Sequence, residues 1–221
     1  MAKVKSQNDR HMPLSISPAG SYGHTALSPP VESPRSFCDS SARGMIQPVP
    51  SPVGHALAGL AVGSLATRDG RWRLPLTCAA AAALPDFDLV LPLAHRGPTH
   101  SIVAGLLTAA MVFVAIAATR RSSSPARIAA ATGVAVLTHV LLDWLSADRA
   151  TPRGVMAFWP FDDTYYISDL DLFSVIERRY WREDFISVNA TALARELLIL
   201  VPIAWLARRK HAKGLARRAQ S

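Results

Sequence analysis

The stretch SIVAGLLTAAMVFVAIAAT (residues 101–119) carries no charged side chain along its whole length. A helix needs about 20 apolar residues to cross the hydrocarbon core of a bilayer, so this stretch is long enough for one crossing. Residues 128–145 and 190–207 are nearly as apolar, whereas the apolar stretches 55–66 and 74–84 are too short to cross alone. Three long stretches in one small chain favour an integral membrane protein. The predicted fold class is all-α, a multi-pass membrane helix bundle of about four or five apolar helices with the first two short.

The basic residues flank these apolar stretches. In a soluble protein the net charge of +8 at pH 7 would suggest a nucleic-acid partner. In this chain, the basic residues beside the apolar stretches form three groups: Arg68, Arg71 and Arg73; Arg120, Arg121 and Arg127; and Arg208, Arg209, Lys210, Lys213, Arg217 and Arg218. Lys and Arg are enriched in the cytoplasmic loops of membrane proteins. We therefore expect all three groups and the C-terminus to be cytoplasmic, with membrane lipids as partners and no nucleic-acid partner.

Six histidines and aspartates lie at or near the ends of the apolar stretches, where a charged residue costs about 2.5–3.5 kcal/mol on the insertion scale. They are His55, Asp86, Asp88, His100, His139 and Asp143. With the basic groups placed in the cytoplasm, all six fall toward the extracytoplasmic side. His139 and Asp143 share one helix face at i, i+4. After Pro85, a short extended loop is expected to present the carboxylates of Asp86 and Asp88. Thr99 is expected to cap the next helix, with His100 in its first turn.

Each of these residues also has an ordinary structural interpretation. The His139–Asp143 pair is consistent with a polar contact between helices, and Asp86 and Asp88 with ordinary loop acids. His55 and His95 are consistent with residues that face water. The combination is more specific, because neutral imidazole and carboxylate together suit zinc, manganese and related divalent ions. The sequence therefore predicts a metal site that holds one or two ions, zinc before manganese.

Four motifs follow one another in an order that resembles a known family. They are Ser51-Pro52-Val53-Gly54-His55, Leu84-Pro85-Asp86-Phe87-Asp88, His95-Arg96-Gly97-Pro98-Thr99-His100-Ser101 and His139-Val140-Leu141-Leu142-Asp143-Trp144. This pattern is similar to the YdjM-like family of predicted membrane-bound metal-dependent hydrolases of bacteria. The resemblance covers about residues 45–208. It implies a multi-helix protein of the bacterial inner membrane with a divalent-metal site, and a hydrolase activity whose substrate is unknown.

The donor set suggests a role for each residue. We expect His55, Asp86, His100, His139 and Asp143 to be metal ligands and Asp88 to be a ligand or general base. Arg96 is expected to stabilise a substrate phosphate, with a lipid head-group or structural contact as the alternative. This favours a hydrolase that acts on a phosphoester or lipid-linked substrate at the membrane surface. The alternatives are a metal-ion or proton transporter that uses the same cluster, and a non-catalytic membrane protein stabilised by its metal.

The chain is expected to divide into three parts. Residues 1–44 are rich in Ser and Pro and are predicted to be disordered. Residues 45–208 form the membrane-embedded hydrolase domain, and residues 209–221 a basic cytoplasmic tail. Within the domain, residues 146–189 are rich in aromatic side chains and are predicted to form an interfacial cap, either a belt with short amphipathic helices or a lid that grips substrate. Arg195 and Glu196 are expected to reach the interface or to pair with this cap.

We predict that translation of the native protein starts at Met45, because order is expected to begin only there and members of the similar family start close to the Ser51–His55 motif. Mass spectrometry of the native protein tests this. Peptides should begin at residue 45, and abundant peptides from residues 15–35 would contradict the prediction.

Overall fold

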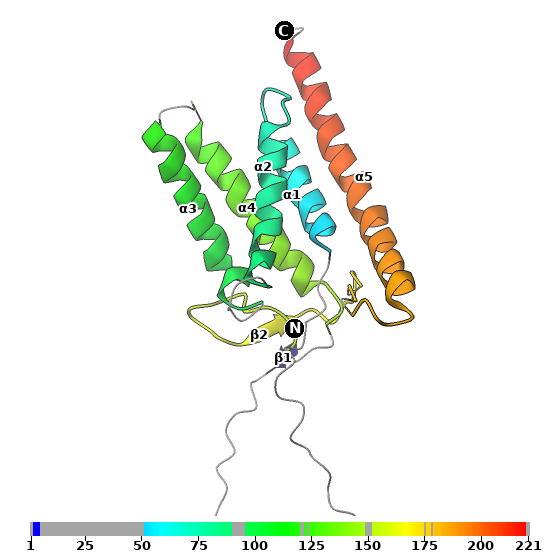
Figure 1. Ribbon diagram of the computed structural model, residues 1–221. Coiled ribbons are helices and arrows are strands. Elements are labelled where there is room, and N and C mark those ends of the chain that lie inside the picture. The colour runs from blue at the N-terminus through cyan, green and yellow to red at the C-terminus, as the bar shows by residue number, and fades with distance from the viewer. Residues whose placement is uncertain are drawn as a thin grey trace, which may run out of the picture. The chain divides into compact units, whose positions relative to one another are not determined.

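The computed structural model describes residues 2–4, 51–89, 96–119, 122, 124–148, 152–174, 176–177 and 179–219. Within these residues the chain is mostly α-helical (Figure 1). The helices are α1 (Pro52–Ala66), α2 (Arg73–Ala83), α3 (Ile102–Thr119), α4 (Pro125–Trp144) and α5 (Phe185–Ala219), with the 3-10 helices η1 (Leu84–Leu89) and η2 (Pro98–His100). Two short strands, β1 (Ala2–Val4) and β2 (Tyr165–Ile167), pair antiparallel.

The five apolar stretches all form helices, which confirms the predicted fold class. Among the described residues, three helices are long and apolar enough to cross a membrane: Ile102–Thr119, Pro125–Trp144 and Phe185–Lys210. α1 and α2 are shorter, as expected. α5 extends beyond its apolar stretch at both ends, and at the C-terminal end the flanking Ala, Lys and Arg residues have good helix propensity.

The short helices occupy the middle of the bundle. α1 contacts α2, α4 and α5, α2 also contacts α4, and α3 packs against α4 (Figure 1). α3 is the most exposed of the three long helices, and only 6% of its apolar window is buried. Its large side chains, such as Leu106, Met111 and Val114, face outward. In this arrangement α3 is free to contact lipid. The polar residues on the inner faces of α1, α2 and α4 are buried between helices.

Glycines allow the closest helix contacts. A Cβ atom built on Gly59 would lie 2.2 Å from the carbonyl oxygen of Cys78, and one on Gly63 would lie 2.6 Å from Cα of Pro75. Gly59 and Gly63 are four residues apart and therefore share the face of α1 that meets α2. Small residues at such spacing bring helix backbones together in membranes, where van der Waals contact replaces the hydrophobic drive. The same device recurs between α3 and α4 at Gly133, where a Cβ would lie 2.9 Å from the oxygen of Gly105.

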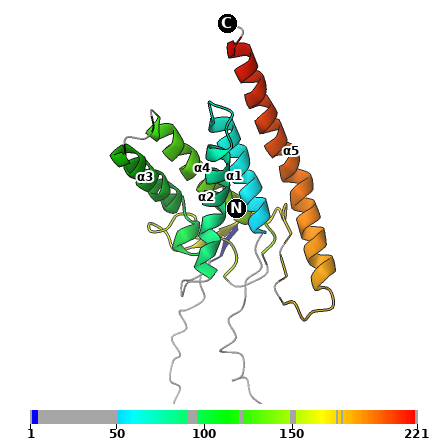
Figure 2. The same cartoon turned by 45° about the horizontal axis from the view of Figure 1, so that its top comes forward.

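The segment between α4 and α5 runs across the end of the bundle where α4 finishes (Figures 1 and 2). It is fastened there by backbone hydrogen bonds from Ser168 to Trp144, from Leu172 to Leu145 and from Ile102 to Ala157. Phe173 is buried against Ala58, Leu142 and Leu200. The described part of the segment therefore lies over this end of the bundle.

Two details of the expected cap are wrong. The first turn of α5 begins at Phe185, so residues 185–189 belong to a long helix rather than to the cap. The described part of residues 146–184 contains β2 and isolated bridges but no helix, so the short amphipathic helices are absent there. The residues pair with one another and with α4 through backbone hydrogen bonds, which satisfies their polar groups without helix formation.

The expected disorder over residues 1–44 falls almost entirely outside the described residues. Within that range only Ala2–Val4 is described, and it pairs with Tyr165–Ile167 of the cap segment. The part of the basic tail at residues 209–219 continues α5.

We predict that Gly59→Ala destabilises the bundle, although alanine has the higher helix propensity by about 1 kcal/mol. The new methyl group would collide with the carbonyl oxygen of Cys78, a backbone atom that cannot rotate away. Overpacking of this kind typically costs about 1–3 kcal/mol. Thermal unfolding in detergent should show a lower midpoint for Gly59→Ala. Leu65→Ala, on an exposed position of the same helix, is the control and should change it little. A raised midpoint for Gly59→Ala would contradict the packing described here.

Candidate metal centre

Five of the predicted ligands converge at one end of the bundle. His55 comes from the first turn of α1, Asp86 from η1, His100 from the end of η2, and His139 and Asp143 from the last two turns of α4. The three imidazoles and Asp143 are fully buried, and Asp86 is 8% exposed. Four separate elements therefore deliver their polar side chains to one enclosed position.

The donor atoms form two overlapping groups. His55, His139 and Asp143 offer one group, Asp86, His100 and His139 offer the other, and the donor atoms of each lie within 4.8 Å of one another. His139 belongs to both groups. The arrangement suits a single ion with several ligands or two neighbouring ions.

The separations between donors match those around a divalent ion. Asp143 Oδ1 lies 3.4 Å from His55 Nε2, and Asp143 Oδ2 lies 3.3 Å from His100 Nε2 and 3.5 Å from His139 Nε2. Asp86 Oδ1 lies 3.7 Å from His139 Nε2 and 3.9 Å from His100 Nε2. Ligands placed about 2.1 Å from a tetrahedral ion are roughly 3.4 Å apart. The donor spacing thus leaves room for an ion at the centre.

Several of these donors have no hydrogen bond within the described part of the chain. This holds for both oxygens of Asp86 and Asp143, both nitrogens of His55 and Nε2 of His139. A buried polar group without a partner costs about 1–3 kcal/mol, and more when it is charged. Metal coordination satisfies such atoms, so the residues present fit a divalent ion.

A backbone carbonyl orients His139. Its Nδ1 lies 2.7 Å from the oxygen of Ala82 at the end of α2. Because a carbonyl oxygen only accepts, Nδ1 carries the proton and Nε2 keeps its lone pair toward Asp86 and Asp143. Histidine ligands of metals are commonly held through the second nitrogen in this way.

Asp88 lies on the far side of His100 from the other carboxylates. Its Oδ2 is 3.3 Å from His100 Nδ1, whereas His100 Nε2 faces Asp86 and Asp143. Thr99 donates a 2.7 Å hydrogen bond to the same oxygen of Asp88. Asp88 therefore contacts the cluster only by way of His100. Its carboxylate lies where it can orient His100 as a metal ligand.

The local backbone differs from two expectations. Asp86 and Asp88 are carried by the 3-10 helix η1 rather than by an extended loop, because Pro85 needs no amide hydrogen bond in the first turn of a new helix. Thr99 does not cap α3. Ser101 accepts the amide hydrogen bond of Ala104 instead, and Thr99 is left to bind Asp88.

Arg96 is buried beside the cluster. Its backbone has a positive φ of 61°, an uncommon conformation for a residue with a side chain. The guanidinium forms an ion pair with Asp148, and its Nε lies 3.9 Å from Asp143 Oδ2. Asp148 also accepts a 2.7 Å hydrogen bond from the amide of Gly154 in the cap segment. The structure thus shows the structural contact that was the alternative for Arg96, to an acid the sequence did not single out.

The charges of the cluster favour a cation. Around the cluster, the described residues include four buried carboxylates (Asp86, Asp88, Asp143 and Asp148) and one buried guanidinium, that of Arg96. Burial disfavours the charged form of His100, but the carboxylates of Asp86 and Asp88 outweigh burial and raise the pKa of His100 to about 9. The cluster therefore stabilises positive charge at its centre.

Sequence reasoning missed one buried contact next to the site. Glu196 of α5 is fully buried and accepts hydrogen bonds from the amide (2.7 Å) and the hydroxyl of Ser51, the residue that caps α1. Glu196 thus pairs with the N-cap of α1 rather than with the interface or the cap, whereas Arg195 donates a 3.4 Å hydrogen bond to Ser174 of the cap segment. A signal was present, since a lone glutamate inside an apolar stretch needs a buried partner. His95, the weakest candidate, lies outside the described residues.

The comparisons with known proteins identify one family. No curated protein and no solved structure matches the chain. The family model of the YdjM inner membrane protein matches residues 51–215, a span that contains all five converging residues and the three long apolar helices. The chain therefore belongs to the YdjM inner membrane protein family.

Proposed function

We propose that this protein is a membrane-bound metal-dependent hydrolase. The observation that carries the proposal is the convergence of five buried side chains from four elements. Among the described residues, both oxygens of Asp86 and Asp143 and both nitrogens of His55 have no hydrogen-bond partner. A closed structural site needs only four ligands. Five ligands, with the further carboxylate of Asp88 nearby, suit an open site, or two ions, with positions left for water and substrate.

The donor set favours zinc, with manganese second, since imidazole and carboxylate suit both. His55, His139 and Asp143 would hold one ion, and Asp86 and His100 would complete its shell or, with a carboxylate oxygen of Asp143, hold a second ion, because Nε2 of His139 can serve only one ion. Bound in this way, the metal would supply a water of lowered pKa and polarise a phosphoryl or carbonyl oxygen.

The chain's own residues set the geometry for that chemistry. The carbonyl of Ala82 holds His139 in one tautomer, and Asp88 does the same for His100. We therefore place Asp88 as a positioning residue rather than a ligand. Arg96 is fixed by Asp148 at 3.9 Å from Asp143, where its guanidinium can steady a substrate phosphate without first being ordered.

The surroundings favour a phosphoester or lipid-linked substrate. The site lies at one end of a bundle whose outer face exposes large apolar side chains, so a substrate dissolved in the membrane can approach it. The segment between α4 and α5 crosses the same end and presents aromatic residues such as Phe158, Phe161 and Trp181 at its surface. Aromatic side chains of this kind favour the bilayer interface.

We predict that the full-length protein, purified in detergent, contains zinc or manganese at one or two ions per chain. His139→Ala and Asp143→Ala should lose it, because each removes a donor from the shared centre. Asp88→Asn should weaken metal affinity by about 10–100-fold, as expected for a residue that orients a ligand. Elemental mass spectrometry measures the content. Thr138→Ala, one position away on α4 and bonded only to its own helix, is the matched control and should keep the metal.

Wild-type protein that stays free of metal after supplementation with zinc or manganese would contradict the metal centre. Retention of full metal content by His139→Ala would contradict the ligand assignment.

We predict that the metal-loaded protein in nanodiscs hydrolyses a phosphoester. A panel of aryl phosphate monoesters, aryl phosphate diesters and short-chain phospholipids, followed by product release, would identify the class. Chelation should abolish turnover and the same metal should restore it, and Arg96→Lys should raise KM more than it lowers kcat if Arg96 holds the substrate phosphate. A fully metal-loaded protein that hydrolyses none of the panel but moves zinc across vesicle membranes would be a transporter instead.

A further inference from the structure

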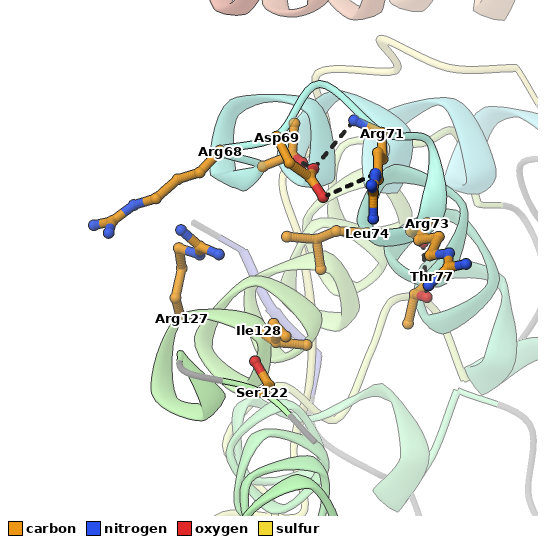
Figure 3. A pocket seen from close by; sticks show the side chains of 10 residues that line it. Arg68, Asp69, Arg71, Arg73, Leu74, Thr77, Ser122, Arg127 and Ile128 are labelled. Carbon is orange, nitrogen blue, oxygen red and sulfur yellow. Dashed lines mark hydrogen bonds and ion pairs between the residues drawn. The ribbon is translucent and has the colours of Figure 1, made fainter. Parts of the chain in front are cut away.

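A second polar site lies at the opposite end of the bundle, where the loop between α1 and α2 and the loop before α4 meet. It is a pocket of about 600 Å³. Its lining residues are Thr67, Arg68, Asp69, Arg71, Arg73, Leu74, Thr77, Ser122, Arg127 and Ile128. Figure 3 shows Arg68 and Arg127 on one side of Leu74 and Arg71 and Arg73 on the other. None of these residues belongs to the metal centre.

The pocket carries a strong positive charge. Four arginines line it with a single acid, Asp69, so their formal charges sum to +3. Asp69 is already engaged by Arg71, whose amide donates a 3.1 Å hydrogen bond to Oδ1 and whose Nε lies 3.8 Å from Oδ2. Thr67 donates a further 2.9 Å hydrogen bond to Oδ1. The charges of Arg68, Arg73 and Arg127 are therefore left uncompensated by the one acid of the pocket.

Arg127 gives the second observation. It is half-buried, and its Nε and Nη1 are enclosed with no hydrogen-bond partner in the described part of the chain. The preference for basic residues on the cytoplasmic side accounts for the number of arginines, but it does not account for enclosed guanidinium donors that bind nothing. Enclosed donors of this kind are satisfied by an acceptor that enters the pocket.

The helix ends reinforce the preference for an anion. α2 begins at Arg73 and α4 begins at Pro125, so the positive ends of two helix dipoles lie beside the pocket. Guanidinium groups bind phosphate through two parallel hydrogen bonds, a geometry that a carboxylate matches but that chloride cannot. The volume leaves room for a phosphate group together with the atoms attached to it.

We propose that this pocket binds a phosphate group, supplied either by the head group of an anionic phospholipid or by a soluble phosphate. Arg127 is the central contact, and Arg68 and Arg73 close around the ligand from the rim. The site is independent of the metal centre, and its occupancy does not require the proposed hydrolase activity.

The test uses the full chain in detergent and native mass spectrometry with three probes. These are short-chain phosphatidylglycerol, short-chain phosphatidylcholine as the zwitterionic comparison, and inorganic phosphate as a competitor. The variants are Arg127→Gln and Arg73→Gln. The matched control is Arg209→Gln, which removes the same charge from the same end of the bundle but outside the pocket, where Arg209 stacks on Trp205. Circular dichroism checks that each variant keeps its helix content.

We expect wild-type protein to bind phosphatidylglycerol more tightly than phosphatidylcholine. Arg127→Gln should weaken phosphatidylglycerol binding by about tenfold, the loss expected from one charge-assisted hydrogen bond, while Arg209→Gln leaves it unchanged. Competition by inorganic phosphate would show that phosphate alone fills the pocket. Arginine-dependent binding without such competition would identify the lipid head group as the source. Equal binding by wild type, Arg127→Gln and Arg73→Gln, or equal binding of the two lipids, would overturn the proposal.

Discussion

The structure depends on one constraint, which is that ionisable side chains enclosed in an apolar bundle must be compensated. A charged group transferred into such surroundings without a partner shifts its pKa or destabilises the fold by several kcal/mol. Here three imidazoles and two carboxylates meet at one position, and the neighbouring polar groups fix their orientation. The carbonyl of Ala82 fixes His139, Asp88 fixes His100, and Arg96 lies between Asp143 and Asp148.

Close packing of the helices positions the histidines of this centre. Gly59 and Gly63 let α2 approach α1 closely enough for the end of α2 to reach His139. On the other side of α1, Gly54 leaves room for Glu196, whose Oε2 would lie 2.7 Å from an added Cβ. The carboxylate of Glu196 accepts two hydrogen bonds from Ser51, and His55 lies four residues further along, in the first turn of α1. Polar contacts and glycine contacts thus locate His55 together, and neither would do so alone.

The parts of the structure that were predictable from the sequence have local causes. Uninterrupted apolar length produced the helices, and the i, i+4 spacing placed His139 and Asp143 on one face. The positions of the basic residues predicted that all the candidate ligands lie toward one end of the bundle. What escaped prediction depends on contact between distant segments, such as Arg96 with Asp148 and Glu196 with Ser51. The spacing of apolar residues along the sequence does not predict which distant acid a buried side chain will contact. The prediction of an extended loop at Asp86 was also wrong, because proline is compatible with a 3-10 helix as well as with a loop.

The short first two helices have a consequence for the membrane itself. At about 1.5 Å per residue, the 15 residues of α1 span roughly 22 Å and the 11 residues of α2 roughly 16 Å, against about 30 Å for the hydrocarbon layer. Where this pair faces lipid rather than other helices, the layer thins or water reaches inward at the helix ends. Either response brings bulk water several ångströms closer to the bilayer midplane beside α1 and α2 than beside α3. A thinner layer beside α1 shortens the path that water must take to the metal centre, since His55 lies in the first turn of that helix.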